Sequence, residues 1–354
     1  METYVFGAGA SAPYGAPTMG EFLSRAFSGW TLTSPDRTDF EEDLKIVAGA
    51  IDGQYGTNVL AGQQGGDHFS DAAMVALSKI NVEELLALAD ENRTPDIRQA
   101  LERVIFKTIE RNIHDSGSHE YYKLLMSEIL KSGQEACLIT FNYDLLLDRA
   151  LTDAVRHTTS TWSYAVSFHA GVEDFPSYRD SADPTNRSPL SISLLKLHGS
   201  LNWGQCPKCT SLRLWYYNKY DNIFRKTLPS CRNCSEVSTG FEPVLVAPTP
   251  AKRFPRTLDS AWNTAANCLQ KTEKLTVIGY SFPAFDRESR RLFLKNFIIP
   301  NLFANPTPKL VIIDPDESAR KSIKSLFLPA VEKNVAEYST FEDYCAVLQQ
   351  SRCR

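Results

Sequence analysis

Short runs of hydrophobic residues, each bounded by Gly, Pro, Asn or Asp, recur along the chain. Such runs are typical of strands that are buried on both faces of a parallel sheet. Segments of helical periodicity, such as 145–155 and 290–297, lie between them. This alternation predicts an α/β fold, a Rossmann-like open parallel sheet of about six strands covered by helices. The predicted strands are Thr3–Phe6, Cys137–Phe141, Leu194–Leu197, Val244–Ala247, Leu275–Ile278 and Leu310–Ile313.

Residues 36–134 interrupt the alternation with a pattern that is almost wholly helical and contains no good strand. Asn81, followed by Glu84, predicts a capped helix over 82–89. A Thr-Pro pair then opens a longer amphipathic helix over 95–113. These features predict a helical insertion within the sheet domain.

Three other segments complete the predicted organisation of a single domain over 1–354. Residues 53–66 are rich in Gly and Gln with little to pack, which predicts a surface loop or a lid. Residues 205–239 carry paired cysteines and predict a small zinc-ribbon module. Residues 317–354 predict a C-terminal helical tail.

Composition narrows the possible classes of protein. The 354 residues are 43% hydrophobic and 23% charged, which excludes a disordered or fibrous chain. The net charge of −4 and the lack of a long basic run give no indication of a nucleic-acid-binding face. No apolar stretch reaches the roughly 18 residues of a membrane span. The first residues lack a secretory pattern, so we expect a cytoplasmic protein.

Four of the eight cysteines form two C-x-x-C pairs. Four thiolates satisfy tetrahedral zinc, and a closed sulfur shell leaves no position for a reacting water. The pairing favours structural Zn²⁺ over a disulfide framework or four unrelated free thiols. The predicted ligands are Cys206, Cys209, Cys231 and Cys234.

Small residues follow the first predicted strand, where a helix would begin. Unpaired amides at such a turn suit a phosphate, although glycine also serves tight turns for steric reasons alone, and both explanations stay open here. The residues are Gly7, Ala8, Gly9, Ala10 and Ser11.

Polar residues also follow the later strands, and ligands of open α/β sheets bind at that edge. Asn142 and Asp144 follow the second strand, where either a ligand contact or a helix cap would explain them. His198 follows the third strand and is a general-base candidate, because imidazole titrates near neutrality. Asp314 follows the last strand and suits a ribose hydroxyl or an ordinary turn equally. Small and polar candidates follow the fifth strand, namely Gly279, Tyr280, Ser281 and Asp286.

The order of these motifs, GAGAS, TFNYD, KLHGS, the paired C-x-x-C, GYSF and IIDPD, resembles that of the Sir2-like (sirtuin) family from Met1 to about Asp316. The resemblance implies a Sir2-like catalytic domain that uses NAD as a substrate. Asn142 would contact the nicotinamide ribose, His198 would be catalytic, and the four cysteines would hold zinc. Gly7–Ser11 would cradle the NAD phosphates, and Pro17 and Thr18 would also contact NAD.

Departures from that family point to a subgroup. Residues 15–20 stand where protein-deacylating sirtuins carry a GIPDFR-like segment, and Phe141 stands where their TQN motif has Gln. The variant motifs look more like divergent bacterial Sir2-like proteins that hydrolyse NAD in anti-phage defence. The leading hypothesis is therefore an NAD+ hydrolase. An NAD-dependent protein deacylase and a non-catalytic NAD or ADP-ribose sensor are the alternatives.

By family analogy, such a hydrolase needs control, because depletion of NAD kills the host cell. We therefore expect a homo-oligomer, a separately encoded regulatory partner such as an ATPase or a nucleotide-processing enzyme, or both.

Overall fold

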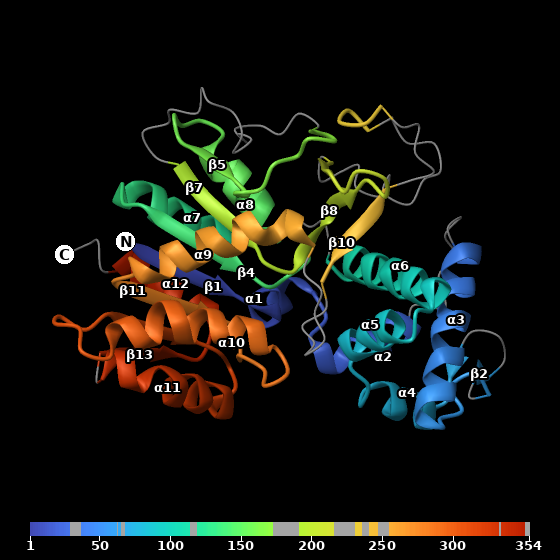
Figure 1. Ribbon diagram of the computed structural model, residues 1–354. Coiled ribbons are helices and arrows are strands. Elements are labelled where there is room, and N and C mark those ends of the chain that lie inside the picture. Colours follow the sequence, from blue (N-terminus) through green and yellow to red (C-terminus); the bar gives the residue numbers. More distant parts are fainter. Residues whose placement is uncertain are drawn as a thin grey trace. The chain divides into compact units, whose positions relative to one another are not determined.

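The computed structural model describes residues 1–28, 37–61, 63–64, 68–113, 119–172, 191–215, 231–235, 241–246, 255–332 and 334–350. The chain forms two compact units (Figure 1). We call Met1–Ser11, Gly117–Val246 and Arg253–Arg354 the sheet unit. We call Ala12–Ser116 and Ala247–Lys252 the helical unit.

A seven-stranded parallel sheet forms the core of the sheet unit, in the order β13-β12-β11-β1-β4-β7-β5. The central strands are apolar and buried; every residue of β4, for example, is buried. The predicted parallel α/β architecture is confirmed. The strands are β1 (Glu2–Phe6), β4 (Ala136–Thr140), β5 (Thr161–Ser163), β7 (Ser191–Lys196), β11 (Lys274–Ile278), β12 (Lys309–Ile313) and β13 (Val335–Tyr338).

The prediction of a parallel strand at 244–247 is wrong. This run belongs to β10 (Glu242–Leu245), which pairs antiparallel with β8 (Gly199–Gln205). Both lie in a separate four-stranded sheet, β10-β8-β9-β6, with β9 at Leu212–Leu214 and β6 at Gly171–Val172. Ala247 lies outside the described residues. A short apolar run indicates burial but does not specify the strand beside it.

Two strands of the main sheet, β5 and β13, were not predicted. β5 has only three residues, too few for a periodic pattern. β13 lies at the sheet edge and is half-exposed, so it lacks the continuous apolar run of a central strand.

Helices cover both faces of the parallel sheet, with α9 in front of the strands and α8 behind β7 in the view of Figure 1. Helix α10 continues into a π-helical turn, η6 (Leu294–Ile298), and a 3-10 turn, η7 (Ile299–Asn301). The α-helices of the sheet unit are α1 (Ala8–Ser11), α7 (Glu120–Ser132), α8 (Leu146–Val155), α9 (Asp259–Gln270), α10 (Arg287–Phe293), α11 (Glu317–Val331) and α12 (Phe341–Gln350). A short 3-10 turn, η5 (Arg256–Leu258), precedes α9.

The helical unit confirms two helix starts read from the sequence. Helix α5 (Val82–Glu91) begins after Asn81, whose Oδ1 accepts the Glu83 amide at 2.8 Å. Helix α6 (Pro95–Asn112) begins at its proline. The other elements are η1 (Ala12–Tyr14), η2 (Met19–Glu21), α2 (Phe22–Ser28), α3 (Arg37–Tyr55) and α4 (Asp71–Leu77).

Two details of the insertion differ from the prediction. Helix α3 runs to Tyr55 and so includes Gly53, the first residue of the predicted loop. A two-stranded hairpin, β2 (Gln63–Gln64) and β3 (His68–Phe69), occurs where no strand was expected. Residues 62 and 65–66 of the predicted loop lie outside the described residues. Among the helices described, none has the length and apolar character to cross a membrane.

Candidate functional site

The parallel topology brings most of the predicted site residues to one edge of the sheet. The segments after β12, β11, β1, β4 and β7 follow in that order along the carboxyl edge. The chain builds one half of the sheet from β1 to β5 and the other from β11 to β13, so the strand order reverses between β1 and β11. Open α/β sheets bind ligands at such a reversal point.

At the reversal point the loops after β1 and β11 pack backbone to backbone. The Gly7 amide donates to Ile278 O at 3.0 Å, and the Gly9 amide donates to Gly279 O at 3.0 Å. A Cβ on Gly279 would lie 2.3 Å from Ala10 N, and one on Gly7 would lie 2.5 Å from Gly279 O. These glycines therefore have a steric explanation. The Gly7 and Gly9 amides already have protein acceptors, as does Ala10, whose amide donates to Gly7 O at 2.9 Å.

Asn142 is anchored to the segment after β1. Its Nδ2 donates to Gly7 O at 2.8 Å and to Ser11 Oγ at 3.1 Å. Ser11 is fully buried, and its Oγ lies 3.0 Å from the Tyr122 hydroxyl. The hydroxyl of Ser11 thus orients the Asn142 side chain, which stays partly exposed.

Asp144 has the geometry of a helix-capping residue. Its Oδ1 accepts the Leu146 amide at 3.0 Å, at the first residue of α8. The side chain is 7% exposed, and this burial raises the pKa of Asp144, although the nearby Lys196 ammonium and a Ser11 hydrogen bond oppose the rise. Of the two explanations that the sequence left open, capping accounts for Asp144 but not for Asn142.

His198 lies in the turn between β7 and β8 beside a buried carboxylate. Its Nε2 is 3.3 Å from Asp286 Oδ2, and the two side chains are 2% and 0% exposed. The same carboxylate oxygen accepts the Tyr280 hydroxyl at 2.8 Å and the Ser289 hydroxyl at 2.5 Å. Asp286 is also the N-cap of α10. An imidazole beside an oriented carboxylate can take up a proton, because the carboxylate stabilises the imidazolium.

Asp286 was predicted as a polar candidate after the fifth predicted strand, but its pairing with His198 was missed. The two residues follow different strands, β11 and β7, and no local spacing connects them. The signal that could have found the pair is topological, since both strands end at the same edge of the sheet.

Aromatic rings line the His198 imidazole. Phe141 stacks on Tyr280 with ring centroids 4.1 Å apart and meets His198 edge-on at 5.0 Å. Gly199 lets β10 approach the turn, since a Cβ at its φ of +85° would lie 1.9 Å from Val244 O. His198 O in turn accepts the Val246 amide at 2.9 Å. The imidazole is therefore buried in a turn that aromatic contacts and a main-chain hydrogen bond hold in place.

The remaining predicted residues have other surroundings. Asp314 Oδ1 accepts the Asp316 amide at 2.9 Å, which is the turn expected of an Asp-Pro pair. Ser281 is exposed. Ala8 lies within α1. Pro17 and Thr18 belong to the helical unit, where Thr18 Oγ1 donates to Glu21 at 3.3 Å.

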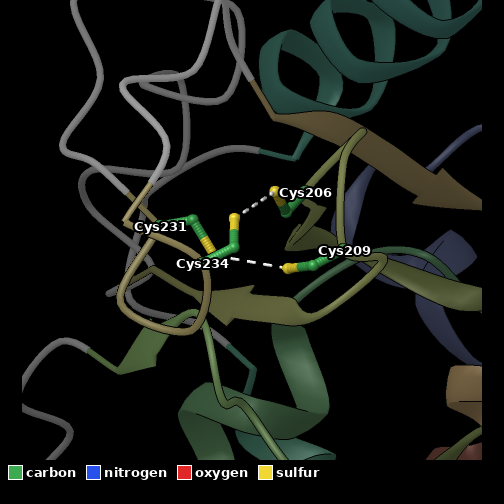
Figure 2. A group of neighbouring side chains, drawn as sticks. All are labelled: Cys206, Cys209, Cys231 and Cys234. Carbon is green, nitrogen blue, oxygen red and sulfur yellow. Dashed lines mark hydrogen bonds between the residues drawn. The ribbon is translucent and has the colours of Figure 1, made fainter.

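The four predicted zinc ligands form one cluster beside the second sheet (Figure 2). All four sulfurs lie within 4.8 Å of one another, with Cys206 to Cys234 at 3.8 Å and Cys209 to Cys231 at 3.6 Å. Tetrahedral zinc with bonds of about 2.3 Å places its sulfurs roughly 3.8 Å apart. The cluster therefore fits a zinc ion in both chemistry and spacing.

The thiols of the cysteine cluster have contrasting surroundings. Hydrogen bonding by Ser211 lowers the pKa of the Cys209 thiol to about 6, whereas burial raises the pKa of the Cys231 thiol. Cys206 and Cys231 are buried in a small apolar core with Trp215 and Phe241.

No family model and no curated protein matches this chain. Solved structures of Sir2 proteins are similar to it at low identity. A Sir2 enzyme matches with 15% identity over 100% of this chain and 93% of its own, at a TM-score of 0.47. A Sir2 bound to an inhibitor, 2′-O-acetyl-ADP-ribose and a deacetylated peptide matches with 13% identity over 100% and 94%, at 0.44. A variant of a Sir2 homologue in complex with ADP-ribose matches with 14% identity over 99% and 92%, at 0.46.

Proposed function

We propose that this chain is an NAD+ hydrolase that cleaves the nicotinamide N-glycosidic bond to give nicotinamide and ADP-ribose. The observation that carries the proposal is the buried pair of His198 and Asp286, held beside Phe141 of the segment that carries Asn142. The ordered motifs that resemble those of sirtuins support NAD as the substrate.

In this reaction the bond between the ribose C1′ and the nicotinamide nitrogen breaks, and its electron pair leaves with nicotinamide. A water oxygen bonds to C1′ and loses one proton. Positive charge builds on the ribose before the water bond is complete, so the site must orient the ribose and the water and accept a proton.

Asn142 supplies the orientation through its carbonyl oxygen. Its Nδ2 hydrogens are directed at Gly7 O and Ser11 Oγ within the protein, so Oδ1 is the atom that we assign to the water or a ribose hydroxyl. Because the amide is anchored twice, Oδ1 has one fixed direction.

His198 accepts the proton from the water. Asp286 orients the imidazole and stabilises its charge once the proton has moved, and the Tyr280 and Ser289 hydroxyls hold Asp286 in place. The stacked Phe141 and Tyr280 rings exclude solvent and so strengthen these electrostatic interactions.

The zinc that Cys206, Cys209, Cys231 and Cys234 would hold is structural in this proposal. When bound, it cross-links two loops of the second sheet, and four thiolates leave it no open position.

We assign hydrolysis rather than deacylation because residues 15–20 lack the Phe and Arg of deacylating sirtuins. By the same resemblance, we propose that the protein depletes NAD in the cytoplasm as an effector of bacterial anti-phage defence. Its control would come from self-association or from a separate partner.

The test is to incubate the purified protein with NAD, with and without an acetyl-lysine peptide, and to identify the products by chromatography. We expect ADP-ribose without peptide from the wild type and from His157→Ala, which alters an exposed histidine. We expect none from His198→Ala. Acetyl-ADP-ribose formed only with peptide would establish the deacylase instead. Tight binding of intact NAD without any product would establish the sensor.

A further inference from the structure

A fully buried lysine lies at the end of β7, two residues before His198. Lys196 is 0% exposed, and its Nζ lies 3.0 Å from Oδ2 of Asp148, which is also 0% exposed. The same ammonium donates to the main-chain oxygen of Asp144 at 2.6 Å. The other oxygen of Asp148 accepts the Tyr164 hydroxyl.

Stability does not explain this ion pair. Removing two charges from water is costly, and well-packed apolar residues often replace a buried pair with no loss of stability. Apolar residues fill the neighbouring positions of β7, where Leu194 and Leu195 are fully buried. What distinguishes an ammonium from a leucine here is its hydrogen bond to the carbonyl of Asp144.

That hydrogen bond, together with two main-chain hydrogen bonds, fastens the loop after β4 to the segment around His198. The Leu197 amide donates to Thr140 O, and the Leu201 amide donates to Tyr143 O, both at 3.1 Å. These two bonds use only main-chain atoms, so substitution of Lys196 or Asp148 leaves their donors and acceptors in place. The third, from Lys196, is the only one of the three that a side chain supplies.

Asn142 lies between the fastened carbonyls. Its side chain is fixed to Gly7 and Ser11, while its main chain is fixed to the loop that Lys196 closes. Loss of the lysine would release the far end of this loop, and the amide would lose its alignment with His198.

We propose that Lys196 is a positioning residue that, with Asp148, holds residues 141–144 so that Asn142 Oδ1 is fixed relative to His198. This inference rests on the proposed function for its kinetic effect but not for its structural effect. The buried charge of Lys196 thus serves to align the site rather than to stabilise the fold.

The central comparison is between Lys196→Met and the double variant Lys196→Met/Asp148→Leu. The single variant leaves a buried carboxylate without its cation and should lower the melting temperature by several degrees. The double variant removes both charges and should recover that stability. Its kcat should nevertheless stay about 100-fold below wild type with KM little changed, because no donor reaches Asp144 O. Recovery of both stability and kcat would overturn the inference.

A second variant keeps the inference testable if the double variant does not fold. Tyr164→Phe removes a hydrogen bond of Asp148 and leaves the contact between Lys196 and Asp144 O intact. It should retain the wild-type kcat. If Tyr164→Phe lowered kcat as much as Lys196→Met, any disturbance of the buried group around Asp148 would lower activity. The specific positioning role of Lys196 would then be wrong. Lys321→Met, on an exposed lysine, is the matched control.

Hydrogen exchange of the main chain over 141–145, measured without NAD, separates this inference from the proposed function. We expect faster exchange in the double variant than in the wild type or Lys321→Met. Unchanged exchange would overturn the inference even if NAD is the substrate. If the wild type leaves NAD intact while the exchange rises, the proposed function fails and the positioning role stands.

Discussion

The cysteine cluster and the sheet-edge site are assembled in opposite ways. The cluster draws its four ligands from two local C-x-x-C turns, so most of its geometry is set within a few residues. The edge site draws Gly7, Asn142, His198 and Asp286 from the ends of four separate strands. Local spacing builds the first, whereas only the completed sheet builds the second.

The two regions also differ in how their polar groups are satisfied. The four sulfurs converge on a common point that suits a cation. At the edge site, His198 already faces Asp286, and Asn142 already binds Gly7 and Ser11. The edge site is therefore preorganised by its own hydrogen bonds, whereas the cluster offers four sulfurs that could bind a common ion.

The largest expected effect is the loss of activity on substitution at the edge site. His198→Ala and Asn142→Ala should each reduce NAD turnover by about 1,000-fold, because one removes the proposed base and the other the proposed orienting carbonyl. Circular dichroism of His198→Ala should stay unchanged, since Asp286 keeps the Tyr280 and Ser289 hydroxyls. Turnover within tenfold of wild type in either variant would remove that residue from the mechanism.

Loss of the metal should act on stability first. Cys231→Ser should abolish stoichiometric zinc and lower the melting temperature markedly, because a structural zinc site contributes folding free energy. Cys268→Ser, which lies outside the cluster, should keep the zinc. Metal analysis that finds no zinc in the wild type would contradict the role assigned to the cluster.

A single methyl group should disturb the turn that carries His198. Gly199→Ala places a Cβ 1.9 Å from Val244 O, so we expect a loss of about 3 kcal/mol of unfolding free energy. Gly20→Ala, where nothing lies within 4 Å, is the control and should change little. Urea denaturation measures the unfolding free energy of both variants. Equal values for Gly199→Ala and Gly20→Ala would show that the turn at Gly199 can accommodate a Cβ, contrary to its geometry.

The smallest expected effect is a difference between Asp314 and Asp316, two residues of one turn, in how their contributions to stability depend on pH. Burial raises the pKa of Asp314, so its contribution to stability is present below the ordinary value of 3.8 and is lost as pH rises through the folded value. Hydrogen bonds from Ser318 lower the pKa of Asp316, so its contribution is present above 3.8 and is lost as pH falls through the folded value. Each variant, Asp314→Asn and Asp316→Asn, should remove the corresponding dependence from urea denaturation measured across this range. If both variants changed the pH dependence of stability in the same direction, the opposite pKa shifts assigned to Asp314 and Asp316 would be contradicted.

Sequence alone predicted the features that local patterns encode. The central strands follow from continuous apolar runs, the starts of α5 and α6 follow from Asn81 and Pro95, and the cysteine cluster follows from its spacing. The antiparallel placement of β10 was missed because an apolar run does not specify its partner strand.

The positions of the edge-site residues at the ends of strands were predicted, but the contacts between these residues were not. Asn142 and His198 were located at strand ends, yet the bonds from Asn142 to Ser11 and from His198 to Asp286 join distant segments. Lys196, in β7, and Asp148, in α8, were missed because charged residues in strands and helices are usually exposed, and local sequence does not show that the fold buries these two together.

The proposed hydrolysis of NAD depends most directly on cooperation between His198 and Asp286. A double-mutant cycle of His198→Ala, Asp286→Asn and the combined variant, read as nicotinamide release without peptide, tests it. We expect the wild type to release nicotinamide and the combined variant to be no slower than His198→Ala, since Asp286 acts through the imidazole. If the two substitutions lowered nicotinamide release by independent factors that multiply in the combined variant, the proposed cooperation would be contradicted. The absence of nicotinamide release by the wild type would contradict the proposed hydrolysis itself.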